Sequence, residues 1–217
     1  MVAAMNFADD AIKLADYISS LHGFFDLIEP RYGYHHMGAT ISDTVLQAGL
    51  NYRHVVEPRV RRLIIEHPDA RTTSDFQELL AFHGLKTLLR WNDPEKPRRI
   101  MEMTWFFSTE GLQTESMVCQ WLQQPGNANL LLQLKGVGPK TVDYLKMLVG
   151  IPAIAVDRHI KSLVSNIGLQ YKQYEDVRKV VGLAADHLGV NRNSFDWAIW
   201  SYLSSKQAWK VVPVSAS

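Results

Sequence analysis

Apolar residues recur every three to four positions along most of the chain, the spacing that places them on one face of an α-helix. The first such run covers residues 6–22 and follows Asn6, a residue type that caps helix N-termini. Its apolar positions are Phe7, Ile12, Leu14, Ala15, Ile18 and Leu21. We therefore expect an amphipathic helix over this stretch.

Capping residues, prolines and glycines indicate where further helices start and stop. Ser42 heads the run SDTVLQAGL, and Pro58 suits the first turn of a helix over VVEPRVRRLIIEH. Ser74 and Gln77 have the spacing of a capping box, and Gly84 is placed to end that helix. Further helices are predicted at about residues 96–108, 113–123, 128–135, 139–149, 157–167, 173–188 and 194–205.

Strand-like patterns are nearly missing from the sequence. Residues 153–156 form the best candidate, and we interpret them as an extended connector between two helices. With about ten helices joined by short turns marked by glycine and proline, the predicted fold class is all-α.

The composition fits a globular protein. The chain has 217 residues, of which 47% are apolar and 21% charged, enough for one compact domain or two small lobes. Disordered and fibrous proteins do not have this balance. The one cysteine, Cys119, excludes an internal disulfide, a four-cysteine zinc site and a cysteine-ligated iron–sulfur cluster. His35 and His36 are adjacent and cannot share the helix face of a two-histidine metal site, so no metal site is expected.

Charge alone says little about a partner. The formal net charge is only +1, whereas a strongly basic chain would indicate nucleic-acid binding. Basic residues do gather in local groups, such as Lys96, Arg98 and Arg99, but such groups are typical of solvated helix faces. No apolar run is long enough to span a bilayer, and the N-terminal stretch lacks the basic start and apolar middle of a signal peptide. We expect a soluble intracellular protein, in the cytoplasm or nucleoid, or in the nucleus of a eukaryote.

The most informative segment is LLLQLKGVGPKTVDYLKML, residues 130–148, in which two helical patterns flank a short turn. Gly136 and Gly138 can adopt backbone angles closed to other residues and allow a ligand to approach the main chain. Pro139 suits the first turn of the next helix, whose N-terminal N–H groups can bind a phosphate oxygen. The same turn is also compatible with a plain helix–helix connector that binds nothing.

The segment LKGVGPKT resembles the hairpin of the helix-hairpin-helix DNA glycosylase superfamily, which includes endonuclease III and 8-oxoguanine glycosylase. Downstream, GIPAIAVDRHI is similar to the segment that carries the catalytic aspartate of that family, in the same order and at nearly the same spacing. The resemblance implies two helical lobes with a cleft between them: residues 30–150, ending in the hairpin, and residues 1–29 plus 151–217. Two features depart from the family pattern: Lys135 stands where proline is common, and the C-terminal four-cysteine cluster of endonuclease III is absent.

Lys140 lies in the first turn of the helix after the hairpin. A cation there opposes the helix dipole, and partial burial would add to that effect, so the position favours the neutral amine that a Schiff-base nucleophile needs. From position alone, however, an ordinary exposed lysine is the favoured interpretation, and only the resemblance reverses it. The resemblance implies that Lys140 attacks the sugar C1′, displaces the base and allows strand cleavage by β-elimination.

Asp157 precedes the helical run RHIKSLVSNIG and is a suitable N-cap for it. The resemblance implies a second role as the catalytic carboxylate, which would assist deprotonation of the nucleophile and stabilise the cationic sugar as the base departs. It also implies that Asp157 lies at the cleft.

The resemblance further implies contacts to DNA from the hairpin, namely Gly136, Val137, Gly138 and Thr141. His159 matches a position that contacts a DNA phosphate, although a plain surface histidine is compatible as well. Gln47 resembles a glutamine that fills the gap left by a flipped base, but a buried or capping glutamine fits the sequence equally. Trp197 and Trp200 are core residues or, by resemblance, part of the base pocket.

These observations predict a base-excision-repair DNA glycosylase with AP lyase activity, which removes a damaged, oxidised base from double-stranded DNA. A monomer is expected, with no cofactor, although the family allows a monovalent cation on the hairpin carbonyls. Two alternatives are a glycosylase without lyase activity, in which Asp157 activates water, and a non-catalytic hairpin module that only binds DNA. A purely structural helical protein would show no salt-dependent affinity for DNA.

Overall fold

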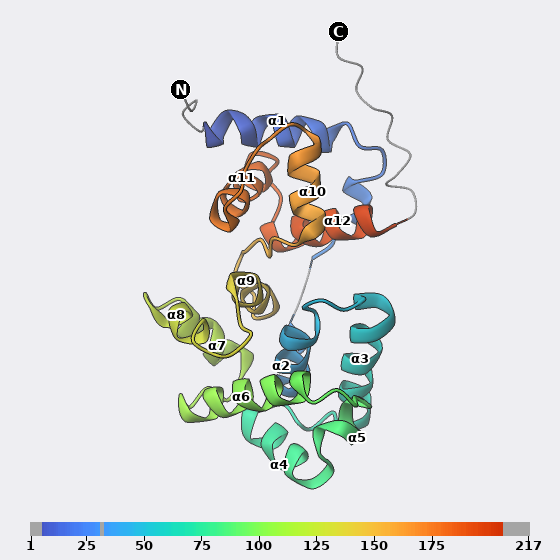
Figure 1. Ribbon diagram of the computed structural model, residues 1–217, viewed down its shortest axis with the longest axis vertical. Helices are drawn as coiled ribbons and strands as arrows, with labels where there is room; N and C mark the ends of the chain where they lie inside the picture. Colours follow the sequence, from blue (N-terminus) through green and yellow to red (C-terminus); the bar gives the residue numbers. More distant parts are fainter. Residues whose placement is uncertain (1–5, 31–32, 206–217) are drawn as a thin grey trace. The chain divides into compact units, whose positions relative to one another are not determined.

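The computed structural model describes residues 6–30 and 33–205, and all regular elements in these ranges are helices. They form two compact units, and the first of these is discontinuous in sequence. Unit 1 comprises residues 1–31 and 152–217, and unit 2 comprises residues 32–151. The predicted all-α class is confirmed (Figure 1).

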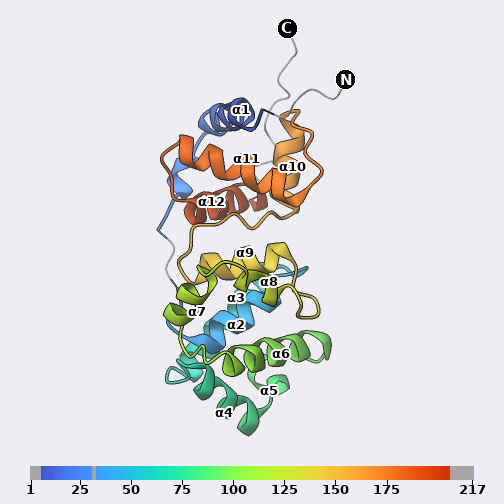
Figure 2. The same cartoon turned by 90° about the vertical axis from the view of Figure 1, so that its left-hand side faces the viewer.

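Unit 1 is built on α11, which packs against α1 on one side and α12 on the other (Figure 2). Its core includes Phe24 and Phe195, both fully buried. The elements of this unit are α1 (Phe7–Ser19), η1 (Phe25–Leu27), α10 (Arg158–Asn166), α11 (Tyr174–His187) and α12 (Arg192–Ser204).

Unit 2 is built around α2, which lies between α9 and α6 in Figure 2 and also packs against α3 and α4. Every residue of α2 is buried, so it is the central helix of the unit. The elements are α2 (Met37–Leu46), η2 (Tyr52–Val56), α3 (Glu57–Glu66), α4 (Thr73–His83), α5 (Leu85–Leu89), α6 (Glu95–Thr109), α7 (Glu115–Leu122), α8 (Asn127–Leu131) and α9 (Pro139–Leu148). In the described ranges, no helix combines the length and the apolar character needed to cross a membrane.

The start of α2 differs from the sequence prediction. Ser42 lies in the middle of the helix, and the N-cap is His36, whose Nδ1 accepts the N–H of Ala39 at 3.0 Å. An imidazole rarely serves as a cap, so its position gives no capping signal in the sequence. The buried carboxylate of Glu115 supports this end, since it accepts the N–H of His35 at 3.0 Å and of His36 at 3.4 Å.

The capping box of α4 also differs from the prediction. It is formed by Thr72 and Asp75 instead of Ser74 and Gln77. Both spacings satisfy the sequence pattern, and the extended backbone at Thr72 decides between them. Gly84 ends the helix as predicted, and the short α5 that follows was not predicted.

Candidate functional site

The hairpin between α8 and α9 uses its two glycines differently. Gly136 has φ +79°, in the region that favours glycine, whereas Gly138 has ordinary extended angles of φ −115° and ψ 178°. Only Gly136 therefore needs the conformational freedom that the sequence suggests for both. Pro139 occupies the first turn of α9, as predicted.

The backbone N–H groups of the hairpin differ in whether a carbonyl of the chain accepts them. Val137 donates its N–H to Leu134 O at 3.0 Å, and its side chain packs against the core of unit 2. Gly138 and Thr141 lie at the start of α9, where helical geometry provides no intrahelical acceptor for an N–H group. The N-terminus of α9 is thus the part of the hairpin best suited to a phosphate.

Lys140 is held by the central helix of unit 2. Its Nζ donates to Gln47 Oε1 at 2.7 Å, and Gln47 is a buried residue that directly follows α2 as its C-cap. The amide of Gln47 also donates to Thr44 O at 3.4 Å. Gln47 is therefore a buried partner of the predicted nucleophile, and its predicted role in filling the gap left by a flipped base stays a prediction.

A second hydrogen bond joins the same two helices one turn further along. Tyr144, four residues after Lys140, donates its hydroxyl to Asp43 Oδ2 at 3.0 Å, and Asp43 lies four residues before Gln47. Residues four apart share a helix face, so two neighbouring side chains on α9 meet two neighbouring side chains on α2. This pair of bonds sets the register between the helices and hence the place of the Lys140 amine.

Asp43 is the centre of a buried polar cluster. Besides Tyr144, its Oδ2 accepts the hydroxyl of Tyr34 at 2.6 Å and of Tyr52 at 3.2 Å. Burial, and then the charge of Asp43, raises the pKa of Tyr34 and of Tyr144 well above the usual value of 10.0. The phenols therefore remain protonated donors, which satisfies Oδ2 of a carboxylate that is fully buried.

Lys96 on α6 binds the end of the same central helix. Its Nζ donates to Val45 O and to Ala48 O, each at 2.7 Å. A cation at this end is favourable, because it faces the negative end of the α2 dipole. Burial, followed by the charges of Arg99 and Lys140, lowers the pKa of Lys96 to about 8. Lys96 and Lys140 thus approach one turn of α2 from two different helices.

Asp157 belongs to unit 1, where an extended connector leads into it. Residues 151–157 have no regular structure, which confirms the predicted connector, and two buried side chains of α12 bind its N–H groups. Asn193 Oδ1 accepts the N–H of Ala153 and Asp196 Oδ2 that of Ala155, both at 2.8 Å.

Asp157 is the N-cap of α10. Its Oδ1 accepts the N–H of His159 at 2.8 Å and that of Ile160 at 2.9 Å. The capping role expected from the sequence is confirmed. Both bonds end on Oδ1, so Oδ2 can still accept a hydrogen bond from water or from an amine.

The remaining predicted residues of unit 1 lie on neighbouring helices. His159 is half-buried in the first turn of α10. Trp197 and Trp200, both half-buried on α12, have ring centroids 4.8 Å apart and planes inclined by 32°. They lie on α12, the same helix whose Asn193 and Asp196 bind the N–H groups of the connector.

Within unit 2 the structure brings together Lys140, Gln47 and the hairpin, while Asp157 and His159 belong to unit 1. Sequence reasoning missed Asp43 and Lys96 as partners of this site. The sequence did offer a signal for Asp43: it lies four residues before Gln47, as Lys140 lies four residues before Tyr144, so each pair shares a helix face. No comparable signal exists for Lys96.

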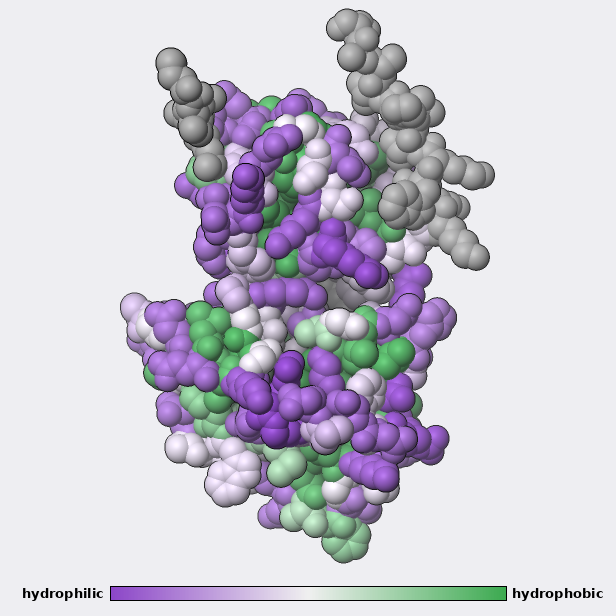
Figure 3. Space-filling view, viewed as in Figure 1, coloured by the Kyte–Doolittle hydropathy of each residue, from purple (hydrophilic) through white to green (hydrophobic). Residues whose placement is uncertain are grey.

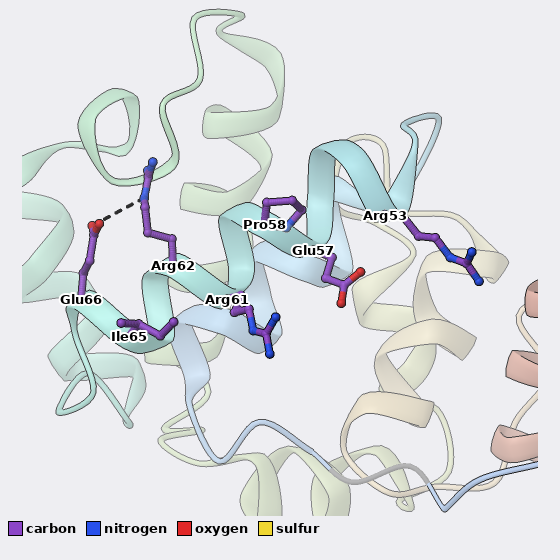
Figure 4. A pocket seen from close by; sticks show the side chains of 7 residues that line it. All are labelled: Arg53, Glu57, Pro58, Arg61, Arg62, Ile65 and Glu66. Atoms are coloured by element: carbon purple, nitrogen blue, oxygen red, sulfur yellow. Dashed lines mark ion pairs between the residues drawn. The ribbon is translucent and has the colours of Figure 1, made fainter.

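A surface pocket of about 460 Å³ lies along α3, away from these residues in sequence (Figure 4). It is lined by Arg53, Glu57, Pro58, Arg61, Arg62, Ile65 and Glu66. Its charges are mixed, and Arg62 pairs with Glu66 at 3.5 Å. None of the predicted site residues lines it, so it is not the candidate site.

Comparisons with known proteins support the fold. Residues 128–204 match a family model described as a domain of unknown function, DUF8548. No curated protein matches the sequence. A crystal structure of the H. pylori 3-methyladenine DNA glycosylase MagIII, bound to 1,N6-ethenoadenine, is similar with a TM-score of 0.60 and 12% identity. The similarity covers 96% of this chain and 100% of that protein, so this chain has the all-helical fold of a DNA glycosylase.

Proposed function

We propose that the protein is a DNA glycosylase that removes a damaged base and cleaves the resulting abasic site with the amine of Lys140. The observation that carries this proposal is the position of Lys140: it lies in the first turn after the glycine hairpin, and its Nζ is held 2.7 Å from Gln47 of the buried central helix. The hydrogen bond to a buried amide holds the amine beside the hairpin, where a nucleophile would be needed. The shared fold with a DNA glycosylase supports the same class of reaction.

The chemistry follows from a neutral amine at this place. The lone pair of Lys140 forms a bond to C1′ of the sugar while the C1′–N bond to the base breaks, and the base leaves with that electron pair and takes up a proton. Opening of the sugar ring then gives an imine, and loss of a proton from C2′ expels the 3′ phosphate by β-elimination. Lys140 lies in the first turn of α9, where the positive end of the helix dipole would favour the neutral, reactive amine.

Asp157 supplies the carboxylate in this proposal. Its negative charge would stabilise the cationic sugar as the base departs, and it would assist deprotonation of the nucleophile. Its capping bonds hold the carboxylate in one orientation, since both N–H donors belong to the first turn of α10.

The damaged base is a separate part of the proposal. The sequence resemblance favours an oxidised base, whereas the MagIII structure has 1,N6-ethenoadenine bound. The substrates to test are therefore duplexes with one 8-oxoguanine, one oxidised pyrimidine, one 1,N6-ethenoadenine or one abasic site.

A glycosylase without lyase activity is the second candidate. It is favoured by the free acceptor capacity of Asp157 Oδ2, which could activate a water molecule instead of the amine. A module that binds DNA without chemistry is the third possibility.

Borohydride trapping on the four duplexes tests the proposal. The wild type should form a covalent adduct with at least one of them, and Lys140→Gln should form none. Lys86→Gln, which removes an exposed lysine on α5, should trap like the wild type and serves as the charge-matched control.

Two substitutions at residue 157 separate chemistry from capping. Asn caps helices about as well as Asp, so Asp157→Asn should keep the stability of the protein and lose excision, whereas Asp157→Ala should also lose about 1 kcal/mol of stability. Base release without any adduct would favour the second candidate. Binding to a damaged duplex without base release from any lesion would reject both enzymes.

A further inference from the structure

The three basic residues near the start of α6 lie within four positions of one another but have different partners in the structure. Arg98 is an ordinary solvated residue, which pairs with Glu95 at 3.1 Å and also with Glu102. Lys96 points to the C-terminal carbonyls of α2. Arg99 extends instead to the hairpin, where it meets Gly136.

The contact between Arg99 and Gly136 is close. A Cβ atom on residue 136 would lie only 2.5 Å from Arg99 Nε and 2.6 Å from Nη1, so the guanidinium rests on the bare main chain of the turn. Any other residue at position 136 would displace it. Gly136 therefore serves two purposes, since it provides the positive φ of the turn and the room for Arg99.

Arg99 forms only a long ion pair with Glu95. Its Nη2 lies 3.6 Å from Glu95 Oε2, which is beyond hydrogen-bonding distance, and the same carboxylate oxygen accepts a bond from Arg98. Among the described residues, Nε of Arg99 has no hydrogen-bond partner, and it is buried against the turn, while the side chain as a whole is 28% exposed. The donors that the guanidinium retains for an external anion are therefore those of its terminal Nη groups.

Further positive charge surrounds this contact. The pKa of Glu95 is lowered chiefly by Arg98, and also by Lys135 of the hairpin and by Arg99, so both of these cations face that carboxylate. Arg99 and Lys140 both act on Lys96. Four cations, Lys96, Arg99, Lys135 and Lys140, therefore lie near this turn, in a chain whose net charge is only +1. Hydrophilic side chains gather over the α6 part of unit 2 in Figure 3.

We infer that Arg99, together with Lys135 and the hairpin backbone, forms a binding surface for the phosphates of a nucleic-acid strand, which we call the α6–hairpin surface. This inference rests on the proposed function, because the strand is the DNA that the enzyme would process. A guanidinium matches the geometry of a phosphate with two parallel hydrogen bonds. Successive phosphates of one strand follow every ~3.4 Å of duplex axis, so a strand held at the N-terminus of α9 would bring further phosphates along the α6–hairpin surface.

Binding to an undamaged duplex, followed by fluorescence anisotropy between 50 and 200 mM salt, tests the surface independently of catalysis. Loss of one phosphate contact lowers the slope of log K against log salt by about 0.9, which corresponds to roughly eightfold weaker binding at 0.1 M. Arg99→Gln should show this loss for any DNA sequence. Arg99→Lys should restore the slope but only part of the affinity, since lysine cannot bind in a bidentate manner.

Two further variants serve as controls. Arg71→Gln removes the same charge from an exposed position before α4 and should leave the slope unchanged. Glu95→Gln removes the carboxylate that competes for Arg99 and should tighten binding. Circular dichroism and the thermal midpoint of each variant establish that it is folded.

The outcomes distinguish this inference from the proposed function. An Arg99→Gln protein with wild-type affinity and slope overturns the α6–hairpin surface, even if the enzyme excises bases. A wild type that depends on Arg99 for duplex binding but releases no base supports the surface and rejects the glycosylase. Arg99-dependent binding to oligoglutamate at least as tight as to the duplex would overturn the surface as a nucleic-acid site.

Discussion

At the scale of single residues, Lys96 is subject to two opposing effects on its protonated form: hydrogen bonds stabilise the ammonium, whereas burial and neighbouring cations destabilise it. Two backbone carbonyls at the C-terminus of α2 accept its N–H groups, which favours the ammonium. Burial and the neighbouring cations Arg99 and Lys140 have the opposite effect, and they prevail, because the pKa falls from 10.5 to about 8. A neutral amine keeps two N–H groups, so both carbonyls remain bonded when the proton is lost.

The pH dependence of stability should reflect this balance. Since the pKa of Lys96 is lower in the folded protein than in the unfolded chain, the unfolded chain binds more protons between pH 8 and 10.5, and stability rises with pH in that window. Between pH 7 and 9 the rise should be about 0.5–1 kcal/mol, because solvent screens a half-exposed amine. Denaturant titration of the wild type and of Lys96→Met at both pH values measures it, and the rise should be missing from the variant. Equal pH dependence of the two proteins would contradict the expectation.

At the scale of elements, the connector before α10 is held by side chains instead of by a neighbouring strand. Ala153 and Ala155 are two residues apart and present their N–H groups on the same side of an extended chain. Asn193 and Asp196 are three residues apart and share a face of α12. The match between these two periodicities fixes the path of the chain up to Asp157.

Removal of either acceptor should loosen the connector. Asn193→Ala or Asp196→Ala leaves a buried N–H group without a partner, which should lower the free energy of unfolding by about 1–3 kcal/mol. Asn193→Asp and Asp196→Asn retain an acceptor oxygen and should lose less. Amide hydrogen exchange at residues 153 and 155 is the local readout, and slow exchange preserved in both alanine variants would rule out this role of α12.

The elements also show which parts of the secondary structure could be predicted from the sequence alone. Positions of most helices, the extended connector and the cap at Asp157 were predicted correctly, because each depends on residues within a few positions of one another. The start of α2 was wrong, since the imidazole of His36 is an unusual cap. The capping box of α4 was placed two residues late, since neighbouring Ser and Thr residues satisfy the same pattern.

At the scale of the whole molecule, each unit has its own hydrophobic core. The core of unit 2 surrounds α2 and includes Phe76 and Phe107, and the core of unit 1 includes Phe24 and Phe195. Unit 1 is discontinuous in sequence, because both its N-terminal helix and its C-terminal helices contribute to one core. Separate cores are typical of separately cooperative regions.

Core substitutions should therefore act mainly within one unit. Phe76→Ala and Phe195→Ala each remove a fully buried ring and should lower stability by about 3–5 kcal/mol. Hydrogen exchange should accelerate most in unit 2 for the first variant and in unit 1 for the second. Equal acceleration throughout the described residues in both variants would show that the protein unfolds as one cooperative body.

The sequence by itself determined the all-α class, the glycine hairpin and the caps at Asn6 and Asp157, because these depend on hydrogen bonds and periodicities that span only a few residues. The tertiary structure alone decided that Lys140 meets Gln47, 93 positions away, and that three tyrosines surround Asp43. Such contacts depend on which helix faces pack together, and that choice is made by burial of the whole apolar surface of a unit. Arg99 illustrates the difference: its charge is evident in the sequence, but its position over Gly136 exists only once α6 and the hairpin have packed.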